Sequence, residues 1–245
     1  MSESSYRVLG INGSPRGDQG ITDMVMRRFL KGAEAAGSET DIIYPAKMKI
    51  AHCLGDLDCW LKTGGQCRHK DDMPMIALKY VASDLLVFAC PVYVDGMTSY
   101  MKKMFERFLC YSPPFVEYVD HRTYHPKNEA DVKDHKVVAI STCGFPEREH
   151  FEALSLHYNR LCQNLHVQLI GEFYFPGSYV IAADPSVAAE QLEAVERAGQ
   201  EAIATGKISD GTIEAANREY IEDLVAFGEQ LNKQFHSLRK QFGVE

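Results

Sequence analysis

The chain has 245 residues, of which 45% are hydrophobic and 24% charged, an ordinary composition for a globular protein. This length suits one large domain, or one domain with an appended extension. A formal net charge of -8 argues against a general nucleic-acid binder or a protein of anionic membranes. No apolar run approaches the ~18 residues of a membrane span.

The first residues and the cysteines bear on the compartment. Residues 1–5 are polar and lack the basic and apolar regions of a signal peptide. Seven cysteines are an odd number for a chain of this size, which disfavours a complete disulfide framework. We therefore expect a cytoplasmic protein.

Apolar segments alternate with amphipathic ones along most of the chain. Five segments are expected to be strands: 6–12, 40–44, 85–90, 137–142 and 167–175. Four are expected to be helices: 23–36, 73–82, 99–109 and 149–165. The alternation predicts an α/β fold, a doubly wound five-stranded parallel sheet with helices on both faces. Five strands fit the flavodoxin-like order 2-1-3-4-5, in which ligands lie beyond the carboxyl ends of the strands.

Two segments exceed this minimal fold. Residues 111–135 contain three prolines with several aromatic and histidine side chains and no clear period, so we expect a long loop with a function or a partner. Further on, helical patterns cover 185–205 and 212–242. We therefore divide the chain into a flavodoxin-like domain, residues 1–180, and a C-terminal helical extension, residues 181–245.

The last helical pattern carries an amphipathic stripe. Its apolar residues recur at spacings of three, four and seven: Ile213, Tyr220, Leu224, Phe227, Leu231, Phe235, Leu238 and Phe242. Two explanations stay open, because the stripe can pack on its own domain or on a second subunit.

The segment 13–22 lies between the first strand and the first helix. A loop rich in Gly, Ser and Thr at a helix start suits a phosphate, because amides, hydroxyls and the helix dipole favour an anion there. It is neither a P-loop, since Asp18 stands at the second glycine position, nor a dinucleotide fingerprint, since Gly10 and Gly13 are three apart. It suits a phosphate monoester such as that of FMN; otherwise it is a hydrophilic turn with Thr22 as an N-cap.

Two motifs together resemble the flavodoxin-like NAD(P)H-dependent FMN reductase family. One is Gly13-Ser14-Pro15-Arg16 with Gly20 and Thr22, and the other is Pro91-Val92-Tyr93 followed by Lys102 and Glu106-Arg107. Asp95 and Glu106 depart from the family, which has glycine and aspartate there. The resemblance covers about residues 6 to 180, and it implies bound FMN and NAD(P)H as electron donor.

The resemblance also assigns residues to the cofactor. Those for the phosphate are Ser14, Arg16, Gly20, Ile21 and Thr22. Those along the flavin ring are Pro91, Val92, Tyr93, Val94, Asp95, Gly96, Thr142, Cys143 and Gly144. Amides of the Pro91–Gly96 loop would stabilise the negative charge of the reduced ring, while Tyr93 either flanks the ring or packs on the core. No catalytic residue is assigned, and Lys102 and Arg107 are expected to form structural ion pairs.

A cysteine-rich segment follows the second strand. It resembles the region in which iron–sulfur flavoproteins carry four closely spaced cysteines, but Asp56 stands at the second position and only Cys53, Cys59 and Cys67 remain. A cubane cluster takes four thiolates. Zinc would accept these three with His52 or His69, although neither spacing resembles a zinc finger. We expect no metal here, with an iron–sulfur cluster and zinc as the alternatives.

These features favour an FMN-dependent NAD(P)H oxidoreductase that passes electrons to a small-molecule acceptor such as a quinone or a flavin. The alternatives are a flavodoxin-type electron carrier, an iron–sulfur flavoprotein that serves protein partners, and a binding protein for another phosphorylated ligand. The aromatic stripe and the 111–135 segment predict a homodimer or a dimer of dimers with the flavin near the interface.

Overall fold

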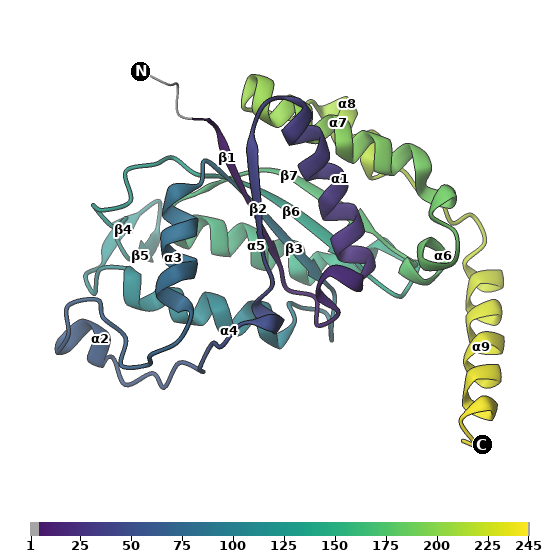
Figure 1. The fold of residues 1–245 in the computed structure, drawn as a ribbon, viewed down its shortest axis with the longest axis horizontal. Helices are drawn as coiled ribbons and strands as arrows, with labels where there is room; N and C mark the ends of the chain where they lie inside the picture. The colour runs from purple at the N-terminus through teal and green to yellow at the C-terminus, as the bar shows by residue number, and fades with distance from the viewer. Residues whose placement is uncertain (1–4, 245) are drawn as a thin grey trace.

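The computed structural model describes residues 5–244, so the expectation for the N-terminal segment falls mostly outside the described residues. Their main sheet has five parallel strands in the order β2-β1-β3-β6-β7, which confirms the predicted flavodoxin-like order (Figure 1). The strands are β1 (Arg7–Asn12), β2 (Glu39–Ile43), β3 (Leu85–Pro91), β6 (Lys136–Thr142) and β7 (Gln168–Phe175).

The strand register sets where the site can form. Asn12 pairs with Ala89, Pro91 with Thr142, and Thr142 with Phe175. The carboxyl ends of four strands therefore reach one edge of the sheet at nearly the same level. The loops that follow them meet there because parallel strands all point the same way.

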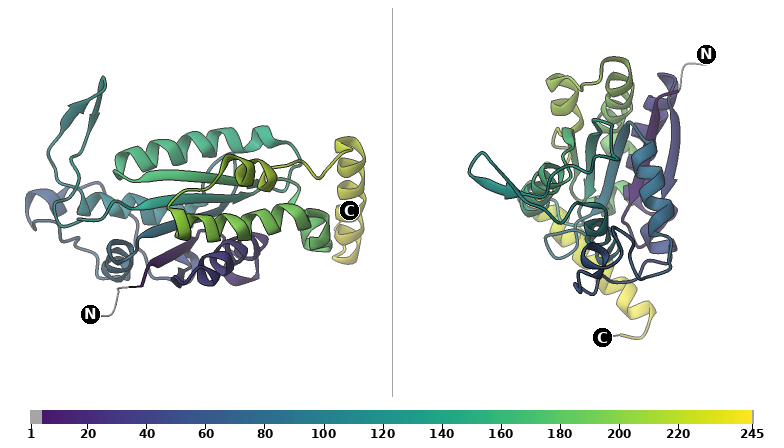
Figure 2. Two further views of the ribbon diagram at one scale, coloured as in Figure 1. Left: turned by 90° about the horizontal axis from the view of Figure 1, so that it is seen from above. Right: turned by 90° about the vertical axis from the view of Figure 1, so that its left-hand side faces the viewer.

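Helices cover both faces of the sheet, as expected of a parallel sheet. The helices are α1 (Ile21–Ala35), α2 (Asp58–Leu61), α3 (Met73–Ala82), α4 (Ser99–Arg107), α5 (Glu152–Asn164), α6 (Ser178–Ala183), α7 (Ala189–Thr205), α8 (Asp210–Ala216) and α9 (Leu224–Gln241). One apolar core joins the sheet to α1 and α7, and a second joins it to α3, α4 and α5. Figure 2 shows α5 on one side of the sheet and α1 with α7 on the other.

Helices α1 and α7 approach each other through two glycines. A Cβ on Gly32 would overlap the carbonyl of Glu196, and one on Gly199 would overlap the carbonyl of Phe29. Helix α7 belongs to the predicted C-terminal extension, yet it buries Leu192, Val195 and other side chains in the first core. The domain boundary at residue 180 stays a prediction.

The prediction of one continuous helix over 212–242 is wrong. The segment is divided into α8 and α9 by a connection that contains Asn217 and Tyr220. The side-chain amide of Asn217 donates to Glu172 O and accepts from Tyr174 N, at 2.8 and 2.9 Å. Strand β7 is at the edge of the sheet, and these bonds pair its Glu172 carbonyl and Tyr174 amide. Asn217, the residue after α8, is held at the sheet edge by them, so the helix ends before it.

The 111–135 segment is also more ordered than a loop. It contains the antiparallel hairpin β4 (Glu117–Val119) and β5 (Arg122–Tyr124). Asp120 and His121 form its turn with φ values of 49° and 62°. Neither is the glycine that usually marks such a turn, so the sequence carried no clear signal for the hairpin.

Candidate functional site

Buried polar side chains form hydrogen bonds with the predicted phosphate loop. Asn12, at the end of β1, accepts from Ser14 N at 2.9 Å and donates to Asp23 at 3.1 Å. The hydroxyl of Ser14 accepts from Arg16 N at 3.2 Å. Gly17 supports the turn with a φ of +56°. These hydrogen bonds hold the backbone of the loop in one conformation.

The N-terminus of α1 has no side-chain cap. Its N-cap is Gly20, which provides no side-chain cap, so the first-turn amides of Ile21 and Thr22 face the loop without one. Thr22 itself is buried within the first turn, so it is not the N-cap that the alternative interpretation assumed. Arg16 is exposed on the rim. An uncapped helix end beside hydroxyls and a cation is suited to an anion.

Three loops from different strands are joined by specific contacts. The hydroxyls of Thr22 and Thr142 lie 2.8 Å apart and connect the first and third loops. Thr98, the N-cap of α4, donates from its hydroxyl to Gly13 O at 2.6 Å and connects the first and second. Val92 N donates to Thr142 O at 2.8 Å and connects the second and third. The structure therefore brings together the three predicted flavin loops.

The second loop ends in a tight, strained turn. Tyr93 and Gly96 exchange backbone hydrogen bonds, and the two residues between them, Val94 and Asp95, have φ values of 51° and 57°. A β-branched residue rarely adopts such a φ, at a cost of about 1–3 kcal/mol. Val94 is fully exposed and Tyr93 half exposed. Tyr93 is therefore not a core aromatic, and the turn extends into solvent.

In the third loop, Cys143 is buried and Gly144 lies beside the ring of Tyr179. Burial raises the pKa of the Cys143 thiol, which favours the neutral thiol over a reactive thiolate. A Cβ on Gly144 would meet the ring of Tyr179 in α6. Tyr179 in turn packs edge-on against Phe235 of α9, with ring centroids 5.7 Å apart. The C-terminal extension thus reaches the third loop.

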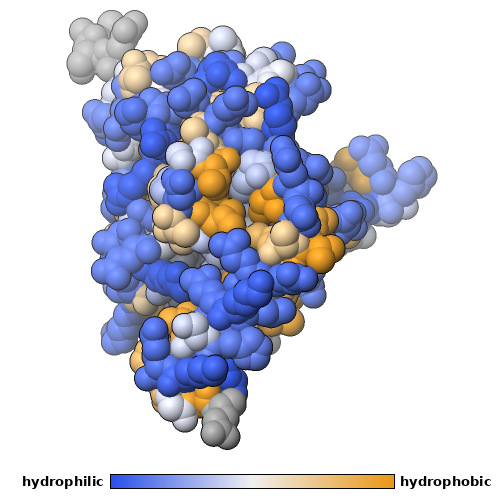
Figure 3. Space-filling view, turned by 90° about the vertical axis from the view of Figure 1, so that its right-hand side faces the viewer, coloured by the Kyte–Doolittle hydropathy of each residue, from blue (hydrophilic) through white to orange (hydrophobic). Residues whose placement is uncertain are grey.

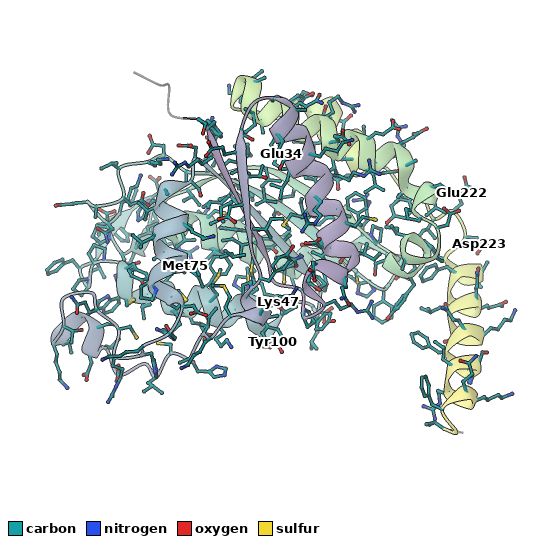
Figure 4. All side chains as sticks on the ribbon, viewed as in Figure 1. Glu34, Lys47, Met75, Tyr100, Glu222 and Asp223 are labelled. Carbon is teal, nitrogen blue, oxygen red and sulfur yellow. The ribbon has the colours of Figure 1, made fainter. Side chains whose placement is uncertain are left out.

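The carboxylate of Asp23, which accepts a hydrogen bond from Asn12, has two further partners. Buried Asp23 accepts from Tyr44 Oη at 2.8 Å and from Arg27 Nε at 2.6 Å. Burial and the hydrogen bond to Asp23 raise the pKa of Tyr44. On the outer side Lys47 pairs with Asp18 at 2.6 Å; Figure 4 labels Lys47 near the start of α1. The spacing of the sequence motifs did not indicate that Asn12, Asp23, Thr98 and Tyr179 belong to the site.

The expected structural ion pairs are present on α4. Arg107 is buried and contacts Asp71 at 2.5 Å, and Lys102 contacts Glu106 at 2.7 Å. The cysteines Cys53, Cys59 and Cys67 border one small pocket near the end of this helix. Within residues 5–244, no three His, Cys, Asp or Glu side chains are placed to hold a single metal ion.

A cavity of about 860 Å³ lies away from the three loops. It lies beside α3, where Leu78, Tyr80 and Phe108 contribute to its lining. The candidate flavin site is instead an open rim, as Tyr93 and Val94 indicate. We assign the site from its converging backbone and hydroxyl groups rather than from cavity size.

Comparison with known proteins agrees with this geometry. A family model for NADPH-dependent FMN reductases matches residues 6–179, which confirms the resemblance drawn from the motifs. An iron–sulfur flavoprotein of Methanocaldococcus jannaschii is 33% identical over 101 residues, which are 41% of this chain and 51% of that protein. The chain spans about half the length of the curated relatives it matches.

Two solved structures share the fold. An NAD(P)H:quinone oxidoreductase from Methanothermobacter marburgensis has a TM-score of 0.60 at 15% identity, over 81% of this chain and 97% of that one. An FMN-dependent NADH-azoreductase from Bacillus anthracis, solved with FMN, has a TM-score of 0.55 at 13% identity, over 81% and 98%. In the described part of this chain, none of the helices is long and apolar enough to cross a membrane.

The residues present fit FMN, the cofactor of this family. Ser14, Thr22 and Thr142 are buried hydroxyls gathered at the uncapped end of α1. Gly20 lies close against Ser14, because a Cβ there would be 3.1 Å from its hydroxyl, which is tighter than an ordinary contact. Such a cradle suits a phosphate monoester approached by backbone amides.

Proposed function

Because the chain belongs to the NADPH-dependent FMN reductase family, we propose that it is an FMN-dependent NAD(P)H oxidoreductase that reduces a small-molecule acceptor. The observation that carries this proposal is the joining of three loops by Thr22, Thr98 and Thr142 at the carboxyl edge of the sheet. When bound there, FMN would accept hydride from a nicotinamide and release electrons to the acceptor.

The phosphate is assigned to the first loop. Ser14 and Thr22 would offer hydroxyls, and Gly20, Ile21 and Thr22 would offer backbone near the uncapped helix end. Arg16 is exposed and free to turn its guanidinium toward a phosphate oxygen. These groups position the ligand and take no part in chemical steps.

The ring is assigned to the second and third loops. Pro91, Val92, Val94, Asp95 and Gly96 provide backbone along one edge, and Thr142, Cys143 and Gly144 provide the other. Amides that point at the ring would stabilise the negative charge of its reduced form. Tyr93, half exposed beside the turn, would limit access of water to the ring.

An electron-transfer role between proteins is the second candidate. The sequence relatives named iron–sulfur flavoproteins favour it, at 33% identity over about half of their length. The rim is open enough for either role. A carrier holds FMN but lacks steady-state turnover with a nicotinamide, so the two candidates differ in kinetics rather than in cofactor.

We propose that the chain forms a homodimer or a dimer of dimers in which α9 contributes to the interface. Helix α9 projects from the rest of the chain (Figures 1 and 2). The apolar residues of the stripe support both explanations. Phe227 is buried on its own domain and Phe235 packs against Tyr179, whereas Leu238 and Phe242 are exposed. Figure 3, which faces this side, shows an apolar patch and further apolar side chains near the C-terminus.

A reducing compartment such as the cytoplasm suits the chain, since its seven cysteines are all unpaired.

The test is steady-state kinetics of FMN-loaded protein with NADH or NADPH and a panel of quinones, flavins, nitro compounds and ferric chelates. Parallel double-reciprocal lines, which indicate a ping-pong cycle, support the oxidoreductase. Flavin that stays oxidised with both nicotinamides, yet is reduced by a protein donor, supports the carrier instead. The acceptor with the highest kcat/KM identifies the substrate class.

A further inference from the structure

A fourth cysteine lies at the cysteine-rich segment. Cys110 follows α4 in a short 3-10 turn, 43 residues beyond Cys67 in the sequence. In the structure it borders the same small pocket as Cys53, Cys59 and Cys67. The expectation of no metal in this segment rested on a count of three thiolates, and the fold supplies a fourth.

Contacts beside the cysteines fix the segment against the residues that follow α4. Trp60, next to Cys59, donates from Nε1 to Leu109 O at 3.1 Å and to Ser112 O at 2.8 Å. Leu109 precedes Cys110 directly. Gly65 N donates to Cys59 O at 2.7 Å, which closes the turn between Cys59 and Cys67. These hydrogen bonds attach the cysteine-rich segment to the residues on either side of Cys110.

Arg107 joins the two ends of the segment under the pocket. It donates to Ala51 O at 3.0 Å and to Asp71, so the ends of a loop of about twenty residues are held together. Its side chain is 1% exposed and also borders the pocket. Its Nε lacks a hydrogen-bond partner although it is buried. A buried cation with an unused donor suits an anionic group bound beside it.

Two kinds of centre take four thiolates. Zinc draws all its thiolates to about 2.3 Å from one ion. No three side chains of the described residues are grouped closely enough for that. In a cubane cluster each thiolate binds a different iron, so the four sulfurs stand further apart. Asp56, at the place of the missing cysteine, is paired with Arg68 at 3.1 Å.

We propose that Cys53, Cys59, Cys67 and Cys110 hold a 4Fe–4S cluster, in which Cys110 supplies the ligand that Asp56 does not. The proposal does not depend on the flavin assignment, because it rests on a different pocket and is measured by metal and sulfide content.

The test is anaerobic reconstitution of the full chain with ferrous iron and sulfide, followed by iron, acid-labile sulfide and zinc analysis and EPR of the dithionite-reduced protein. We expect about four iron and four sulfide per chain. Cys110→Ser should lower the iron content by about half or more and change the EPR spectrum. Cys162→Ser, at a buried thiol of α5 outside the pocket, is the matched control and should behave as wild type.

Three results overturn the proposal: a wild type without iron and sulfide, a wild type with one zinc and no sulfide, or a Cys110→Ser variant with full iron and the wild-type spectrum. FMN content and circular dichroism show whether each variant is folded. If Cys110→Ser fails to fold, Cys53→Ser decides, because Cys53 is exposed. Full cluster content in Cys53→Ser also overturns the ligand set.

Discussion

The hydroxyl oxygens of Thr22 and Thr142 lie 2.8 Å apart although 120 residues separate them in the chain. Both side chains are buried at the carboxyl edge of the sheet, one in the first turn of α1 and one at the end of β6. This contact fixes the distance between the loop assigned to the phosphate and the loop assigned to the ring. It is the structural basis for treating them as one site.

We predict that Thr142→Val lowers the free energy of unfolding by about 1–3 kcal/mol, because the buried Thr22 hydroxyl loses its partner. The double variant with Thr22→Val should cost less than the sum of the single variants. Urea unfolding of all four proteins gives this cycle. Thr123→Val, at an exposed position of the hairpin, is the control and should stay within about 0.5 kcal/mol of wild type. Additive losses would show that the two hydroxyls are not coupled.

Arg16→Ala should weaken FMN binding about tenfold to a hundredfold with the fold intact, since a charge-assisted contact of about 1.5–3 kcal/mol is removed. Fluorescence titration of the apoprotein with FMN measures this. Arg28→Ala removes an exposed arginine of α1 that faces Glu196, and it should leave FMN affinity unchanged. Equal affinities of Arg16→Ala and wild type would remove Arg16 from the phosphate site.

Gly199→Ala should destabilise the protein by about 1–3 kcal/mol or more, because its Cβ would overlap the carbonyl of Phe29 across the α1–α7 contact. Gly228→Ala is the matched control in α9, where a Cβ meets nothing within 4 Å. That change should stabilise the helix by up to about 1 kcal/mol. Thermal unfolding of the two variants should shift in opposite directions. A neutral Gly199→Ala would mean that the helices are further apart than described.

Arg107→Met should lower stability by about 3–5 kcal/mol at neutral pH, because it leaves Asp71 charged and buried. Lys102→Met breaks an exposed pair and should cost about 1 kcal/mol or less. Burial opposes the ionised form of Asp71, but Arg107 and the amides of Ala51 and Met73 outweigh it and lower its pKa. A lowered folded pKa gives stability that is present above the unfolded pKa of about 3.9 and is lost as pH falls below it.

The acid limb of the stability profile should therefore be steeper below about pH 4 in wild type than in Arg107→Met. Urea midpoints measured between neutral and acidic pH give both profiles. Identical acid limbs would mean that Asp71 does not depend on Arg107 for its low pKa.

The sheet could be predicted because its strands carry local signals. Leu85–Pro91 is apolar throughout and buried throughout, as a strand covered on both faces must be. The phosphate and Pro-Val-Tyr loops could be located because they directly follow such strands. The helix break at Asn217 could not be predicted, because it depends on hydrogen bonds to an edge strand over 40 residues away.

The same limit explains the residues that sequence reasoning missed. Thr98 resembles an ordinary N-cap until its hydroxyl is seen to donate to Gly13 O, 85 residues away. Cys110 lies far along the chain from Cys67, and the contacts of Trp60 and Arg107 bring the two cysteines to one pocket. Such contacts follow from the packing of α4 rather than from spacing within a motif.

The central claim is that the three loops bind FMN and that a nicotinamide reduces it. The most direct measurement is an anaerobic titration of FMN-loaded protein with NADPH, and separately with NADH, followed by flavin absorbance. We predict stoichiometric FMN and full bleaching by about one equivalent of at least one nicotinamide, since hydride transfer carries two electrons. A protein that retains no FMN, or one whose bound flavin stays oxidised with both nicotinamides, would contradict the account.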